Sequence, residues 1–152
     1  MEQVSKKSRG VSRSSILLTQ CLQHDYLDEE GSCASNVFVG VAESRRVRQP
    51  LLDFVAKCRN DKTVKTVHIR DWHHRERDKE HLSQFGEHCL QDTKGAELIV
   101  GVGEGEVFVN GRGLNDFLET ELKDLLEELL IGEARVALVG CWSEAKVSGL
   151  LF

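Results

Sequence analysis

The sequence lacks several of the patterns that mark common classes of protein. None of its five cysteines forms a CxxC pair, and their odd number and scattered positions indicate reduced thiols rather than a disulfide framework or a zinc finger. No run approaches the roughly 18 apolar residues of a membrane span, and the first fourteen residues hold no apolar stretch suited to a signal peptide. We therefore expect a cytoplasmic protein with no membrane partner.

An excess of positive charge is also missing. The chain has 20 Lys and Arg against 25 Asp and Glu, which gives a formal net charge of −5. Because nucleic-acid binding usually requires a basic face, we expect a small-molecule ligand or a protein partner and no nucleic acid. The 152 residues suffice for one domain. We place it at residues 15–152, after a flexible basic tail at residues 1–14.

Strand and helix patterns alternate along the chain. Short apolar or β-branched runs predict buried strands at residues 15–19, 64–69 and 134–140, and the pieces LIV and VFV of a glycine-rich stretch predict two shorter strand fragments. Apolar residues at helical spacing predict helices at 50–58, 114–131 and 143–152. Pro50 suits a first turn and Ser143 an N-cap. This alternation predicts an α/β fold with a mostly parallel sheet between two helical layers.

In such sheets, ligands bind beyond the carboxyl ends of the strands. The three segments that matter are therefore residues 20–25, 70–74 and 141–146. They supply the residues that we expect to line a pocket, namely Asp25, Trp72, Cys141, Ser143 and Glu144. Cys21 and Cys141 both follow strands, where each suits a nucleophile or a small apolar filler.

Five of the six histidines lie between residues 68 and 98. Asp71 and His73 directly follow a predicted strand, and His88 comes fifteen residues after His73. One carboxylate and two imidazoles leave coordination positions open, as a catalytic divalent metal such as zinc requires. The alternative is a charged surface loop with solvated histidines, and we assign His74 and His81 to that loop.

Several segments resemble one family, the isochorismatase-like cysteine hydrolases, which include nicotinamidases and carbamoylsarcosine amidases. The segments are ILLTQCLQHDYL, VHIRDWH, FGEHCLQDTKGAEL and VALVGCWSEAKV, and the likeness runs from about residue 16 to 152. It implies a three-layer α/β fold and, in amidase members, hydrolysis of small amides through an aspartate, a lysine and a cysteine. It also places Asp71, His73 and His88 on the metal-ligand positions of nicotinamidases.

The resemblance puts different residues on the triad positions. The aspartate falls on Cys21, the lysine on Asn110 or Gly111, and the cysteine on Lys146. A protonated lysine is a poor nucleophile, and a thiol cannot replace the carboxylate base. The family's last strand and helix are also missing, so we expect a fragment or a sheet edge that is open or covered in a homo-oligomer or larger assembly.

Two functions follow as hypotheses. The first is a catalytically degenerate member that keeps a metal or small-ligand pocket or an interaction role. The alternative is an active metal-dependent hydrolase of a small amide, in which a metal on Asp71, His73 and His88 activates water and Cys21, Cys141 or Glu144 assists. A nonfunctional truncated reading frame is a third reading.

Overall fold

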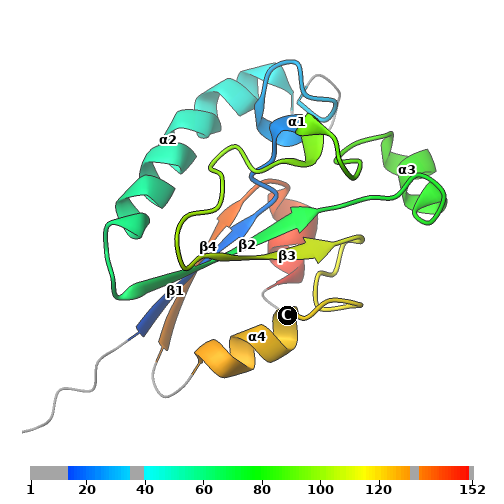
Figure 1. Cartoon of the computed structure of the whole chain (residues 1–152). Coiled ribbons are helices and arrows are strands. Elements are labelled where there is room, and N and C mark those ends of the chain that lie inside the picture. Colours follow the sequence, from blue (N-terminus) through cyan, green and yellow to red (C-terminus); the bar gives the residue numbers. More distant parts are fainter. Residues whose placement is uncertain (1–13, 35–39, 131–133, 151–152) are drawn as a thin grey trace, which may run out of the picture.

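Four parallel strands form the centre of the computed structural model, which describes residues 14–34, 40–130 and 134–150. In the order in which they lie side by side, they are β3 (Val107–Gly111), β2 (Val64–Asp71), β1 (Ser14–Gln20) and β4 (Ala134–Gly140) (Figure 1). The strands predicted at 15–19, 64–69 and 134–140 are confirmed, as is VFV in β3. The predicted burial of 134–140 is wrong, because every residue of this edge strand is exposed or half-buried. Residues 1–13 of the predicted tail lie outside the described residues, and Ser14 already belongs to β1.

Helices flank the sheet on both faces, which confirms the predicted three-layer fold (Figure 1). Along β1 the side chains alternate, so Leu17 enters one core and Ile16 enters the other. The first core lies under α2 (Val41–Arg59) and the second lies over α4 (Leu122–Leu129). The shorter segments are α1 (His24–Leu27), α3 (Lys79–Phe85), the 3-10 turn η1 (Lys94–Ala96) and the π-helical turn η2 (Ser143–Val147).

The predicted start of α2 is wrong. The helix begins at Val41, and Pro50 lies inside it rather than in its first turn. Proline removes the hydrogen bond to the carbonyl four residues earlier. That carbonyl belongs to Arg46, an exposed residue, so water can satisfy it. The charged first half of α2 has few apolar residues, and its helical pattern was therefore missed.

The predicted helix at 114–131 is confirmed only in its second half, since α4 begins at Leu122. Before that point the side chain of Asn115 accepts a hydrogen bond from the N–H of Phe117 at 3.0 Å, which favours a turn. Glu119 then adopts a φ of 57°, outside the helical region. Of the apolar residues in these turns, Phe117 packs against the core, whereas Leu114 and Leu118 are exposed.

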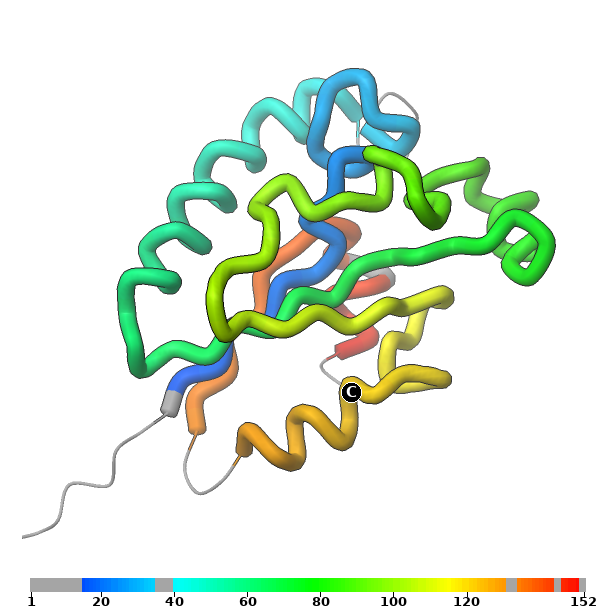
Figure 2. Tube along the Cα trace, in the orientation of Figure 1, coloured from blue at the N-terminus to red at the C-terminus, as the bar shows by residue number. Residues whose placement is uncertain are grey.

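The piece LIV is not a strand. Leu98 forms only an isolated antiparallel bridge with Gln23, just beyond the end of β1. Figure 2 shows the long connection between α3 and β3 passing α1 and then α2 before it enters the sheet. The first part of this connection lies against the segments that follow β2 and β1, through the bridges of Leu90 with His73 and of Leu98 with Gln23.

β4 forms one edge of the sheet, and no further strand lies beyond it in the described ranges. Arg135, Val136 and Ala137 are exposed there, and Val136 is 49% exposed. No helix within the described ranges is long and apolar enough to cross a membrane.

Candidate metal centre

Strand register brings the ends of the four strands to one edge of the sheet. Gln20 of β1 pairs with Ile69 of β2 and with Gly140 of β4, while Asp71 of β2 pairs with Gly111 of β3. The chain segments that leave these strands therefore meet, as expected for a parallel sheet.

Three imidazoles gather beyond the end of β2. His73, His81 and His88 each offer a ligand nitrogen, and these nitrogens lie within 4.8 Å of one another. The backbone of His73 is anchored, because its main-chain N–H donates a hydrogen bond to the carbonyl of Cys89 at 3.0 Å. His81 comes from α3, and His88 from the loop that follows it. We refer to these three residues as the histidine cluster.

The rings of the histidine cluster touch one another directly. The His73 ring stacks on His81 at 4.6 Å between centroids and meets His88 edge-on at 4.8 Å. His73 and His88 are buried and His81 is half-buried. Burial lowers the pKa of His81 to about 4, with His73 adding to the effect, so the ring is neutral at pH 7.

The ring nitrogens fit a metal ion. Within the described residues, His73 Nδ1 and Nε2, His81 Nε2 and His88 Nε2 are buried and have no hydrogen-bond partner. His88 Nδ1 lies 2.8 Å from the carbonyl oxygen of Gly86, which can only accept, so this nitrogen carries the proton and Nε2 keeps its lone pair. Neutral imidazoles with free lone pairs are ligands suited to zinc.

The prediction that His81 belongs to a solvated loop is wrong, because its ring stacks on His73 inside the cluster. His74 is exposed, as that prediction required. His68 lies elsewhere and is fully buried. Its Nδ1 lies 2.7 Å from the hydroxyl of Thr19, and its Nε2 lies 3.0 Å from Glu106.

Asp71 lies beside the histidine cluster but is not one of its mutually close members. Its Oδ2 is 3.9 Å from His73 Nε2 and 4.0 Å from His88 Nε2, and it accepts a hydrogen bond from the Tyr26 hydroxyl at 2.6 Å. Its Oδ1 accepts a hydrogen bond from Lys146 Nζ. Burial alone would raise the pKa of Asp71, but Lys146 and His73 outweigh it and hold that pKa well below its usual range.

Lys146 is fully buried and points from η2 into the sheet edge. In this π-helical turn the Trp142 carbonyl accepts hydrogen bonds from the N–H groups of both Lys146 and Val147. The ammonium bonds Asp71 and lies 3.2 Å from Asp116 Oδ1. Burial would lower the pKa of Lys146, but the facing acidic groups raise it above its ordinary value, so the amine stays protonated.

Cys21 and Asn110 have different surroundings. Cys21 is fully buried with a φ of 53°, and its thiol lies 3.7 Å from Asp71 Oδ2. Burial, followed by the charge of Asp71, raises the pKa of Cys21 well above the usual value for a thiol. Asn110 is half-buried, and its side-chain oxygen accepts a hydrogen bond from Arg70 Nε at 2.7 Å.

The expected pocket residues have separate roles in the described structure. Asp25 accepts hydrogen bonds from the N–H groups of Ser32 and Cys89 and so joins two loops. Trp72 is half-buried, and the Arg70 guanidinium lies 4.0 Å from its ring centroid. The remaining three belong to the segment after β4: Cys141 is buried, Ser143 is exposed, and the side chain of Glu144 lies outside the described residues.

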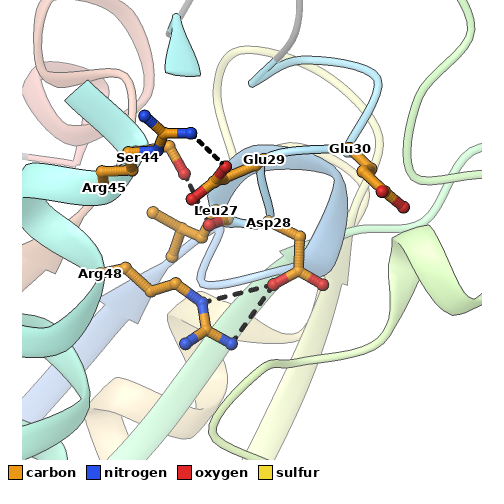
Figure 3. A pocket seen from close by; sticks show the side chains of 7 residues that line it. All are labelled: Leu27, Asp28, Glu29, Glu30, Ser44, Arg45 and Arg48. Atoms are coloured by element: carbon orange, nitrogen blue, oxygen red, sulfur yellow. Dashed lines mark hydrogen bonds and ion pairs between the residues drawn. The ribbon is translucent and has the colours of Figure 1, made fainter. Parts of the chain in front are cut away.

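A cavity of about 420 Å³ lies away from the histidine cluster, between the loop after α1 and helix α2 (Figure 3). Its charges pair with one another: Arg45 bonds Glu29 at 2.6 Å, and Arg48 lies 3.3 Å from Asp28. Ser44 donates a hydrogen bond to the Leu27 carbonyl. Among the described residues, no side chain of this lining has a buried nitrogen or oxygen without a hydrogen-bond partner, in contrast to the histidine cluster.

The sequence was compared with models of known protein families. The sequence matches the family model of the isochorismatase domain over residues 16–149. The chain belongs to the isochorismatase family. No curated protein matches the sequence.

Solved structures of isochorismatase-like proteins share the fold at low sequence identity. N-carbamoylsarcosine amidase from Thermoplasma acidophilum is 17% identical with a TM-score of 0.71, over 90% of this chain and 72% of that one. Pyrazinamidase of Pyrococcus horikoshii, solved in complex with zinc, is 23% identical with a TM-score of 0.70, over 91% and 76%. Nicotinamidase/pyrazinamidase from Bacillus subtilis is 17% identical with a TM-score of 0.73, over 91% and 77%.

Sequence reasoning missed two residues of this isochorismatase-family site. His81 lies among charged residues in the sequence. Its role follows only from its place on α3, which brings its ring against His73. Asp116 looked like a solvated position of an amphipathic helix, yet it is 1% exposed and faces Lys146. Its side chain fills the space beside Gly111, where an added Cβ would lie 1.9 Å from Asp116 Oδ1.

Proposed function

We propose that this isochorismatase-family protein binds a divalent metal ion, with zinc as the best fit, and does not perform the cysteine-dependent amide hydrolysis of the family's amidases. The observation that carries the proposal is the histidine cluster, in which buried imidazole nitrogens face one another without hydrogen-bond partners. Buried polar atoms in native proteins are normally paired, so such a group needs a ligand to explain it.

The donor set supports zinc. His73, His81 and His88 would supply three imidazole nitrogens and would leave a coordination position open for water or a ligand. The Pyrococcus horikoshii pyrazinamidase, which shares the fold, was solved with zinc. A zinc ion bound in such an open site supplies Lewis acidity and lowers the pKa of a bound water.

The positions that resemble the amidase triad support the loss of amidase chemistry. At position 146 the amine is protonated and bonded to two carboxylates, so it has no lone pair with which to attack an amide. The thiol of Cys21 cannot serve as a carboxylate base, and the amide of Asn110 carries no charge.

The proposal is tested by metal binding and by turnover, measured on the full chain. Zinc should bind at one ion per chain, and His81→Ala should abolish binding while His74→Ala, an exposed control, should not. Nicotinamide and pyrazinamide should not be hydrolysed above the background rate. Absence of zinc binding would remove the metal half of the proposal, and hydrolysis of either amide would remove the other half.

A second candidate function is a hydrolase with exchanged catalytic groups. It is favoured by one observation: Cys21 and Lys146 both contact Asp71, and Asp116 contacts Lys146, so a thiol, an amine and a carboxylate meet at the sheet edge. The raised pKa of Cys21 opposes it, because a protonated thiol is a weak nucleophile. Small-amide turnover that is lost in Cys21→Ser would establish this alternative.

A further inference from the structure

The two oxygens of Asp71 face different partners. Oδ2 points toward His73 and His88 at 3.9 and 4.0 Å, a position from which a carboxylate could join a metal bound there. Oδ1 is bonded to the ammonium of Lys146, and both side chains are fully buried. Asp71 thus contacts both Lys146 and the histidine cluster.

Charge decides how this shared carboxylate behaves. A buried carboxylate attracts a cation strongly only while its own charge is unbalanced, because the local dielectric is low. Lys146 already balances the charge of Asp71 across a direct hydrogen bond. A metal ion that recruited Asp71 would have to weaken this ion pair and approach a fixed positive charge.

Asp116 holds Lys146 in place from the other side. Its Oδ1 lies 3.2 Å from Lys146 Nζ, and its side chain is 1% exposed. Gly111 leaves the space that Asp116 fills. The ammonium is therefore fixed between two carboxylates rather than free to swing away from Asp71.

We propose that Lys146 sets the metal preference of the histidine cluster by withholding Asp71 from the metal. The inference rests on the proposed metal-binding function and adds which ions the site accepts. With Asp71 held by Lys146, the donors are the three imidazoles of the histidine cluster. Such a set suits zinc and other ions with a preference for nitrogen, and it disfavours Mn²⁺ and Mg²⁺, which prefer carboxylate oxygen.

The decisive variant is Lys146→Met, which removes the ammonium and keeps a long apolar side chain. Equilibrium dialysis of the full chain with Zn²⁺ and with Mn²⁺ should show Mn²⁺ affinity rising by about 10- to 100-fold, the size of effect that partners of metal ligands commonly exert. Zinc affinity should rise less. The double variant Lys146→Met with Asp71→Asn should lose the gain for Mn²⁺, since the gain requires a freed carboxylate.

Asp71→Asn in the unchanged background tests the same proposal without leaving a buried charge unpaired, should Lys146→Met fail to fold. We expect zinc affinity to fall by no more than about threefold in this variant, against a loss of more than about 100-fold in His81→Ala. A loss of tenfold or more in Asp71→Asn would show that Asp71 is already a ligand and would overturn the inference.

The remaining outcomes separate the inference from the proposed function. Zinc binding with equal Mn²⁺ affinity in the wild type and Lys146→Met would overturn the role of Lys146 and leave the metal site standing. Absence of zinc binding in every variant would overturn both.

Discussion

The histidine cluster and the corner formed by Lys146, Asp71 and Asp116 lie at the same edge of the sheet, and they differ in how their polar groups are bonded. In the cluster, buried ring nitrogens of His73, His81 and His88 have no hydrogen-bond partner among the described residues. Around Lys146, the ammonium bonds Asp71 and Asp116. Buried ring nitrogens without hydrogen bonds favour binding of an external ligand. The ion pairs of Lys146 favour an internal structural role, although Asp116 Oδ2 there also lacks a hydrogen-bond partner among the described residues.

This difference suits the histidine cluster to the proposed binding of a metal ion and Lys146, with its two carboxylates, to a structural role. In the resemblance to the hydrolase family, Lys146 of the corner falls on a position of the amidase triad, and His73 and His88 of the cluster fall on metal-ligand positions. Under the proposed function, metal binding therefore does not depend on the amidase groups. Asp71 joins the two regions, and variants on either side of it test whether they are independent.

The largest effect is expected from His81→Ala. Removing one of three imidazoles should lower zinc affinity by more than the 10- to 100-fold that loss of an outer partner causes. Isothermal titration calorimetry on the full chain measures this loss directly. His74→Ala, which changes an exposed histidine of the same segment, should bind zinc like the wild type. Equal losses of zinc affinity in His81→Ala and His74→Ala would contradict the assignment of His81, and not His74, to the metal site.

Lys146→Met should destabilise the fold by about 3–5 kcal/mol, because it leaves Asp71 and Asp116 buried without their cation. The free energy of unfolding in urea provides the measurement. Lys123→Met is the matched control, since Lys123 is 72% exposed and its ion pair with Glu127 should contribute no more than about 0.5 kcal/mol. If Lys146→Met lowers the free energy of unfolding by less than about 1 kcal/mol, the ion pairs of Lys146 with Asp71 and Asp116 do not stabilise the fold as proposed.

Gly111→Ala should reduce the free energy of unfolding by about 1–3 kcal/mol, because the new methyl group would overlap Asp116 and push it from Lys146. Gly113→Ala lies two residues away, and nothing lies within 4 Å of an added Cβ there. Urea unfolding of both variants makes the comparison. If both variants lower the free energy of unfolding by similar amounts, Asp116 can move away from the new methyl group at position 111 without destabilising the fold further.

The smallest effect concerns His68, a histidine of the same segment whose ring nitrogens, unlike those of the cluster, both have partners. Its partner Glu106 also bonds Arg59, and despite burial these contacts lower the pKa of Glu106 to about 2. A carboxyl with a lowered folded pKa stabilises the fold above its unfolded pKa of 4.5, and this stability is lost as the pH falls toward 2.

Linkage with these pKa values would give a loss of about 3 kcal/mol between pH 6 and pH 2, and because solvent screens this half-buried group we expect about 1–2 kcal/mol. Urea unfolding across this range measures it, with Glu106→Gln as the variant in which the pH dependence flattens. An unchanged slope in Glu106→Gln would contradict the assignment.

The sheet followed from the sequence because apolar runs mark parallel strands, and β4 was predicted with its observed bounds but not with its exposure as an edge strand. The start of α2 and the turns before α4 did not follow, since Pro50 is tolerated at an exposed position and Asn115 redirects a helical pattern. Local spacing could not reveal such tertiary effects.

Within the site, His73 and His88 were identified, but His81 was not. Its role depends on how α3 folds back over the end of β2, which the intervening charged residues conceal. The partners of Lys146 were also hidden, because Asp71 and Asp116 come from distant segments of the chain.

Anomalous X-ray scattering at the zinc edge, from crystals of the full chain grown with zinc, tests the central claim most directly. We predict one zinc ion bonded to nitrogens of His73, His81 and His88 at about 2.0–2.1 Å, with Asp71 still bonded to Lys146. An absence of zinc from the histidine cluster would contradict the account, and so would a zinc ion bonded to Asp71 with Lys146 displaced.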